Sequence, residues 1–205
     1  MNFTKPLFDE YLENKKSGQR KSAMRALNDF LNNCEKLDVG GQRKVVTDFF
    51  QQNNETRDLA YSFPLNSRLL FPVLQAWCAE NPTESWIWRS FAEIALLRQY
   101  LTAAQGDTLA ITENAPLDDL PVRKALCKVL ELDPEDHLAR IMYIDVLQET
   151  LKLLLHDQEA GDATAAEQIP EEVKKISDQL TLLPDSPEKS RLQEQHITYR
   201  DKFIG

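Results

Sequence analysis

The chain has 205 residues, 42% of them hydrophobic, with a formal net charge of −9. This length and apolar content exclude a chain that is disordered throughout, and they suffice for one elongated domain or two small ones. The negative charge repels phosphate, so it excludes nucleic acid as the expected partner.

Helix is the expected structure from the N-terminus onward, because glycine occurs only six times and good helix formers dominate. The first predicted helix begins at Thr4, with Pro6 in its first turn, and ends at Ser17. The second carries apolar residues at helical spacing from Ala23 to Cys34 and ends within residues 37–41. A third helix follows around residues 45–50.

The fourth predicted helix spans about Asn66 to Glu80, and Pro72 inside it predicts either a late start or a kink. The fifth runs from Thr83 to about Leu101. Residues 102–119 have no sustained apolar period and contain many helix breakers, which predicts a long loop.

The sixth predicted helix has Pro121 in its first turn and an N-terminal cap from Asp118 or Asp119. The seventh is capped by Asp136 and extends to about Leu154. Small and polar residues over 157–168 predict a mobile connector. Pro170 opens an eighth helix, and Ser186 with Pro187 opens a ninth.

These nine helices pair by their spacing. The second members of successive pairs end near residues 38, 82, 134 and 184. We therefore expect an all-α fold in one domain over residues 1–205, with about four antiparallel helical hairpins and a C-terminal helix that caps the last apolar face.

A family resemblance follows from the stretch that begins at residue 82. A proline, a tryptophan six residues later, a large apolar residue and a small one resemble the tetratricopeptide repeat, and they are Pro82, Trp88, Phe91 and Ala92. Residues 128–137 are similar to the end of such a repeat, with Val129, Leu130 and Pro134 in the corresponding places. The resemblance covers about residues 74–145 and implies a right-handed superhelix that binds another protein.

The two tryptophans of this stretch have different expected roles. Trp86 and Trp88 are about 200° apart on a helix, so both cannot face the core. Trp88 is predicted to lie in the core. Trp86 either packs against the preceding hairpin or is exposed as an interface anchor.

The sequence carries no recognisable catalytic signature. Nucleophile elbows, phosphate-binding glycine loops, dinucleotide fingerprints and paired metal-binding histidines are all missing. The pair Gly40–Gly41 is interpreted as a helix terminator, and His196, on an apolar stripe, as a packed histidine. We therefore predict a protein that is not an enzyme and has no cofactor or metal.

The expected location is the cytoplasm. No run approaches the ~20 apolar residues that span a bilayer, so no membrane association is expected. The three cysteines are an odd number without metal-binding spacing, which suits a reducing compartment.

Acidic residues are the candidate partner-binding residues. Residues 101–150 hold ten acidic and four basic side chains. The residues predicted to bind a partner are Glu131, Asp133, Glu135, Asp136, Asp119 and Trp86. Asp119 and Asp136 also suit helix capping. A basic partner protein is expected, although the acidity is equally explained by solubility.

Three functions remain open from the sequence. The leading one is a non-catalytic protein-binding protein, in its concrete form an acidic inhibitor of the immunity or antitoxin type that masks a basic partner. The others are an enzyme with a site near the 102–136 loop and acidic cluster, and a self-associating scaffold. The oligomeric state is left open.

Overall fold

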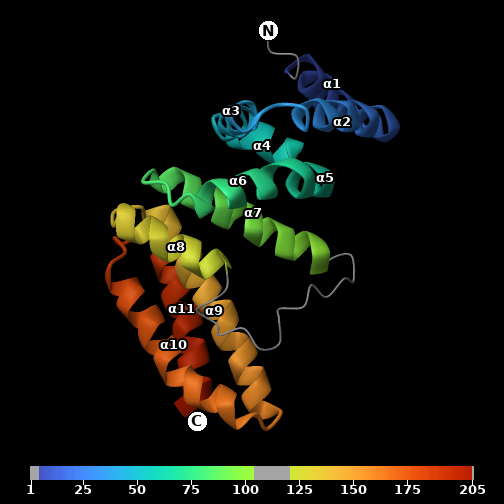
Figure 1. Cartoon of the computed structure of the whole chain (residues 1–205). Coiled ribbons are helices and arrows are strands. Elements are labelled where there is room, and N and C mark those ends of the chain that lie inside the picture. Colours follow the sequence, from blue (N-terminus) through green and yellow to red (C-terminus); the bar gives the residue numbers. More distant parts are fainter. Residues whose placement is uncertain (1–4, 104–120, 205) are drawn as a thin grey trace. The chain divides into compact units, whose positions relative to one another are not determined.

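The computed structural model describes residues 5–103 and 121–204. All regular secondary structure in these two ranges is helical, which confirms the predicted all-α class. The chain divides into two compact units, residues 1–113 and 114–205 (Figure 1). The single domain expected over residues 1–205 stays a prediction.

Unit 1 is a succession of short helices. In chain order they are α1 (Lys5–Lys16), α2 (Arg20–Cys34), α3 (Val39–Phe50), α4 (Asn54–Ala60), α5 (Phe63–Leu65), the π-helical η1 (Asn66–Leu70), α6 (Phe71–Ala79) and α7 (Ser85–Ala103). Helices α1 and α2 pack on each other, as do α3 and α6, which agrees with the predicted neighbours.

The apolar stripe of α2 forms the first part of the core. Its six predicted residues are all buried, namely Ala23, Ala26, Leu27, Phe30, Leu31 and Cys34. Phe8 of α1 lies against Phe30, with ring centroids 5.1 Å apart. The hydroxyl of Tyr11 donates a hydrogen bond to the carbonyl of Ala60 at 2.8 Å, which fixes α1 to the end of α4.

Helix α4 was not predicted from the sequence. It is seven residues long, and Asn53 caps it by accepting a hydrogen bond from the Thr56 amide at 2.8 Å. Only Ala60 is buried along it, so the segment has no apolar stripe to reveal it. Its stability comes from the cap and from contacts with α1.

The prediction that Gly40–Gly41 terminates a helix is wrong. Both glycines lie in the first turn of α3, where the Asp38 carboxylate accepts a hydrogen bond from the Gly41 amide at 2.7 Å. A Cβ on Gly41 would lie 3.1 Å from that carboxylate, so glycine lets the cap approach closely. The carboxylate also occupies the place where an anion would bind the helix N-terminus.

The helix that contains Pro72 begins earlier than predicted, at Phe63, so the predicted late start is wrong. Helices α5, η1 and α6 form a continuous helical stretch, and Pro72 lies in the first turn of α6. Because proline has no amide hydrogen, the preceding turn is π-helical, with the Phe71 amide bonded to the Asn66 carbonyl. The buried side-chain amide of Asn66 donates a hydrogen bond to the Ile94 carbonyl of α7 at 3.0 Å.

The buried face of α7 includes the predicted Phe91 and Ala92, but Ile87 and not Trp88 lies at its start. Ile87 is 1% exposed, and Phe91, Ile94 and Ala95 continue its buried stripe. Trp88 lies half-buried at the edge of this stripe, and its indole N–H donates to the Pro82 carbonyl at 2.9 Å. The prediction that Trp88 is the core residue is therefore wrong, since Ile87 takes that place.

The described part of unit 2 consists of one long central helix and three helices that pack on it. They are α8 (Pro121–Leu132), α9 (His137–Glu159), α10 (Ala163–Thr181) and α11 (Pro187–Ile204). Helices α8, α10 and α11 all pack on α9 (Figure 1). The last helix packs on α9 and α10, and its predicted role as the cap of a hairpin array stays a prediction.

The predicted connector over 157–168 is largely helical. Helix α9 continues to Glu159 and α10 begins at Ala163, so a turn at residues 160–162 joins them. Gly161 has a φ of +97°, and Asp162 caps α10 through the Thr164 amide at 2.8 Å. Pro170 is exposed inside α10 and does not open it. Of the predicted loop over 102–119, residues 102 and 103 belong to α7 and the others lie outside the described residues.

Candidate partner-binding surface

The turn between α8 and α9 presents three of the predicted binding residues. Helix α8 ends at Leu132, two residues before Pro134, and α9 begins at His137. Glu131 and Glu135 are exposed, and Asp133 is half-buried. Lys128 pairs with Glu131 at 2.9 Å. We call Glu131, Asp133 and Glu135 the acidic tip.

Asp136 serves the fold at the same turn. Its side chain is buried and accepts a hydrogen bond from the Ala139 amide at 2.9 Å, which caps α9 as predicted. Arg140 donates hydrogen bonds to the Pro134 carbonyl and to the side-chain oxygen of Gln179 in α10, so it connects the turn to α10. Asp136 is therefore not a surface group, although the sequence placed it among the partner-binding residues.

An exposed leucine lies next to the acidic tip. Leu138, in the first turn of α9, is 57% exposed. The buried stripe of α9 begins one residue later and continues through Ala139, Tyr143 and Leu147, which leaves Leu138 outside it. The sequence signal was available, since Leu138 breaks that helical spacing, but sequence analysis missed it.

The negative charge belongs almost entirely to unit 2. Residues 114–205 hold 19 acidic and 11 basic side chains, a net charge of −8, whereas residues 1–113 hold 14 and 13. The acidic tip therefore lies on a strongly negative unit, while unit 1 is nearly neutral.

Trp86 packs within unit 1. Its ring lies edge-on to Trp77 of α6, with centroids 5.5 Å apart. The Arg43 guanidinium lies 5.0 Å from the Trp77 ring centroid and pairs with Glu80. Of the two roles predicted for Trp86, packing on the preceding hairpin is the one observed; its role in binding stays a prediction. Asp119 lies outside the described residues.

A buried ion pair joins α8 to α10. Arg123 and Glu172 are in contact at 3.1 Å, and their side chains are 1% and 4% exposed. Lys175 also contacts Glu172 at 3.2 Å. Burial raises the pKa of the neighbouring Tyr143 to about 12, so its phenol stays protonated. Neither charge was singled out from the sequence, because the partners are 49 residues apart.

The cysteines of the core are unreactive groups. Burial raises the pKa of Cys34 and of Cys78 to about 12, so both thiols stay protonated at neutral pH. Within the described ranges, no three His, Cys, Asp or Glu side chains gather as metal ligands would. In the same ranges, no helix has the length and apolar character needed to cross a membrane.

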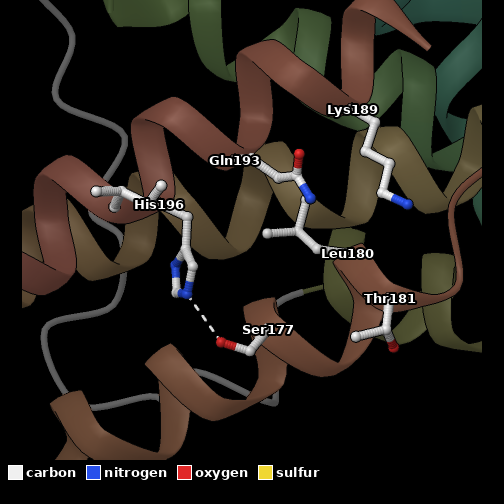
Figure 2. A pocket seen from close by; sticks show the side chains of 7 residues that line it. Ser177, Leu180, Thr181, Lys189, Gln193 and His196 are labelled. Carbon is white, nitrogen blue, oxygen red and sulfur yellow. Dashed lines mark hydrogen bonds between the residues drawn. The ribbon is translucent and has the colours of Figure 1, made fainter. Parts of the chain in front are cut away.

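An open groove of about 520 Å³ lies between α10 and α11 (Figure 2). Leu180 and Ile197 supply apolar surface, and Ser177, Lys189 and His196 supply polar groups. His196 Nε2 lies 2.8 Å from the Ser177 hydroxyl oxygen, across the two helices. His196 is buried, which confirms the predicted packed histidine.

The Ser177 hydroxyl has two neighbouring hydrogen-bonding groups. Its oxygen lies 3.0 Å from the Val173 carbonyl oxygen and 2.8 Å from Nε2 of His196. Nδ1 is buried without a hydrogen-bond partner among the described residues. In a serine nucleophile site a third group holds the histidine by a hydrogen bond, and no described residue does so for His196.

A pH dependence follows from His196. Burial, with a contribution from Arg200, lowers its pKa below the ordinary 6.5. The unfolded chain therefore binds this proton more tightly, so stability is complete above about pH 6.5 and falls as the pH drops below it. Urea denaturation at about pH 7.5 and 5.5 should show a smaller loss for His196→Gln than for the parent. Equal losses in both proteins would contradict this prediction.

No protein-family model, curated protein or solved structure matches the chain.

Proposed function

We propose that the protein is a non-catalytic binding protein whose unit 2 recognises a partner protein with a basic surface. The observation that carries this proposal is the α8–α9 turn. There, an exposed leucine lies beside exposed carboxylates, on a unit with a net charge of −8.

The two kinds of side chain have separate roles in binding. The carboxylates of the acidic tip attract a basic surface over the Debye length, ~10 Å at 0.1 M salt, and so raise the rate of encounter. Leu138 then loses contact with water when an apolar side chain of the partner covers it, which stabilises the bound state.

A concrete version of this proposal is an acidic inhibitor of the immunity or antitoxin type that acts in the cytoplasm. In the same proposal, the helices form a tetratricopeptide-like array of hairpins. Burial of Phe91, Ala92 and Val129 supports this, because the resemblance rests partly on these positions. Packing of helices adjacent in sequence within each unit is also what such an array requires.

Association kinetics test the steering role of the acidic tip. The partner is captured from a lysate of the source cell with the full chain as bait, and its on-rate is measured at about 0.1 M and 1 M salt. We expect the on-rate to fall by roughly tenfold or more at high salt, since the Debye length shortens to ~3 Å. Asp133→Asn with Glu135→Gln should lower the low-salt on-rate severalfold without changing the melting temperature.

The matched control makes the same charge change in unit 1. Asp9→Asn with Glu10→Gln alters two exposed carboxylates of α1, and it should leave the on-rate unchanged. Asp136 is kept intact because its loss would remove a cap worth roughly 1 kcal/mol. An acidic captured partner would contradict the proposal. So would an on-rate that changes neither with salt concentration nor with the tip variant.

A further inference from the structure

The groove between α10 and α11 is a surface of unit 2 that the acidic tip does not include. Both helices pack on α9, yet the residues that line the groove come from α10 and α11 and none from α9. The groove therefore opens on the face of this helix pair that α9 does not cover. It is open to solvent along one side and not an enclosed cavity.

Apolar side chains are left incompletely covered in this groove. Leu180 lies buried at its base, whereas Ile197 at its rim is 46% exposed. Leu182, just beyond the groove on the α10 side, is exposed as well. An open furrow between two helices accepts the side-chain ridge of a third helix, as in ordinary helix packing.

The polar groups of the groove are largely satisfied by the fold. Nε2 of His196 lies 2.8 Å from the Ser177 hydroxyl oxygen. The ammonium of Lys189 donates to the Leu183 carbonyl at 2.8 Å and pairs with Asp185 at 3.0 Å. Arg200, one turn beyond His196, pairs with Asp201 at 3.0 Å. Lys189, the lysine that lines the groove, is thus compensated by an acid.

The negative charge around the groove distinguishes between two possible occupants, a second copy of this chain and a helix with basic flanks. Asp178 follows Ser177 on α10, and Glu194 follows Gln193 on α11; both are exposed beside residues that line the groove. Residues 171–201 hold seven acidic and five basic side chains, Lys174 included. A second copy would bring two units of net charge −8 together, which disfavours self-association. A helix with basic flanks is favoured by the same charge.

We propose that the groove between α10 and α11 binds an amphipathic helix of the basic partner. The apolar ridge of that helix packs on Leu180 and Ile197, and its Lys or Arg side chains face Asp178 and Glu194. This inference rests on the proposed function, since it takes the partner to be basic. The acidic tip steers the partner, and the groove buries its helix.

A designed peptide tests the groove without the natural partner. The probe is a labelled peptide of about 18 residues, with Leu on one helical face and Lys elsewhere, titrated into the full chain by fluorescence anisotropy. We expect saturable binding, and roughly tenfold weaker binding to Ile197→Gln, because the variant loses buried apolar contact. A peptide with Glu in place of every Lys should bind far more weakly.

The matched control is Leu153→Gln, which alters an exposed leucine of α9 that does not line the groove. It should change the affinity less than twofold. A photo-crosslinking residue at position 193 should capture the peptide, and the same residue at position 138 should not. Circular dichroism melts check that each variant is folded.

Three outcomes would contradict the proposal that the groove binds a basic helix. The Lys peptide does not bind, the Glu peptide binds as tightly as the Lys peptide, or the Lys peptide binds Ile197→Gln as tightly as the parent. If the peptide tests contradict the groove proposal while salt and the tip variant still lower the association rate of the natural partner, the proposed function stands. If the peptide binds in the groove while the partner ignores salt and the tip, the proposed function alone fails.

Discussion

Replacing Glu172 by leucine should lower the free energy of unfolding by about 3–5 kcal/mol, because the change removes one partner of the buried ion pair between Arg123 and Glu172. Both side chains lie almost fully out of water, where breaking an ion pair is costly. Circular dichroism during urea denaturation measures this effect across the chain. Tryptophan fluorescence reports unit 1 only, since Trp77, Trp86 and Trp88 all lie there.

Two controls separate the buried charge from general disruption of α10. Glu171→Leu removes the neighbouring carboxylate, which is exposed and also contacts Lys175, and it should cost less than about 1 kcal/mol. Arg123→Met with Glu172→Leu should recover most of the lost stability, because a buried pair replaced by apolar groups is often neutral. If Glu172→Leu costs no more than Glu171→Leu, the pair does not hold α8 on α10.

Ile87→Ala should cost about 2–5 kcal/mol, the range for emptying a fully buried aliphatic site. Ile87 is 1% exposed and belongs to the stripe by which α7 packs on α6. Tryptophan fluorescence during urea denaturation follows this change, because it reports the unit that contains α7.

The comparison with Trp88 tests the corrected face of α7. Trp88→Phe removes one hydrogen bond, to the Pro82 carbonyl, and should cost about 1 kcal/mol. Met24→Ala, at an exposed position on α2, should stay within about 0.5 kcal/mol of the parent. A larger loss for Trp88→Phe than for Ile87→Ala would restore Trp88 as the core residue.

Sequence reasoning was reliable where the information was local. The stripe from Ala23 to Cys34 predicted the buried face of α2. Apolar residues at every third or fourth position lie on one side of a helix, and that side is the one that packs against the core. The cap by Asp136 and the end of α8 before Pro134 were also predicted, since each depends on a few neighbouring residues.

Weak local signals were misread where packing outweighed them. Pro170 is tolerated inside α10 because it lies on the exposed face, while Ala165 and Ile169 bury the other. Helix α4 has too few apolar residues to show a period, yet its end is bound by Tyr11 of α1. In both cases, distant contacts stabilise a helix that its own residues favour little.

The same distinction between local patterns and distant contacts applies to the candidate surfaces. The sequence by itself determined the all-helical class, the position of most helices and the acidity of the second half, because propensity, periodicity and charge are properties of neighbouring residues. Only the tertiary structure decided that Asp136 is buried, that Leu138 is exposed, that Glu172 meets Arg123 and that α10 and α11 leave a groove. These features arise from contacts between helices far apart in the chain, and no local pattern encodes which faces meet.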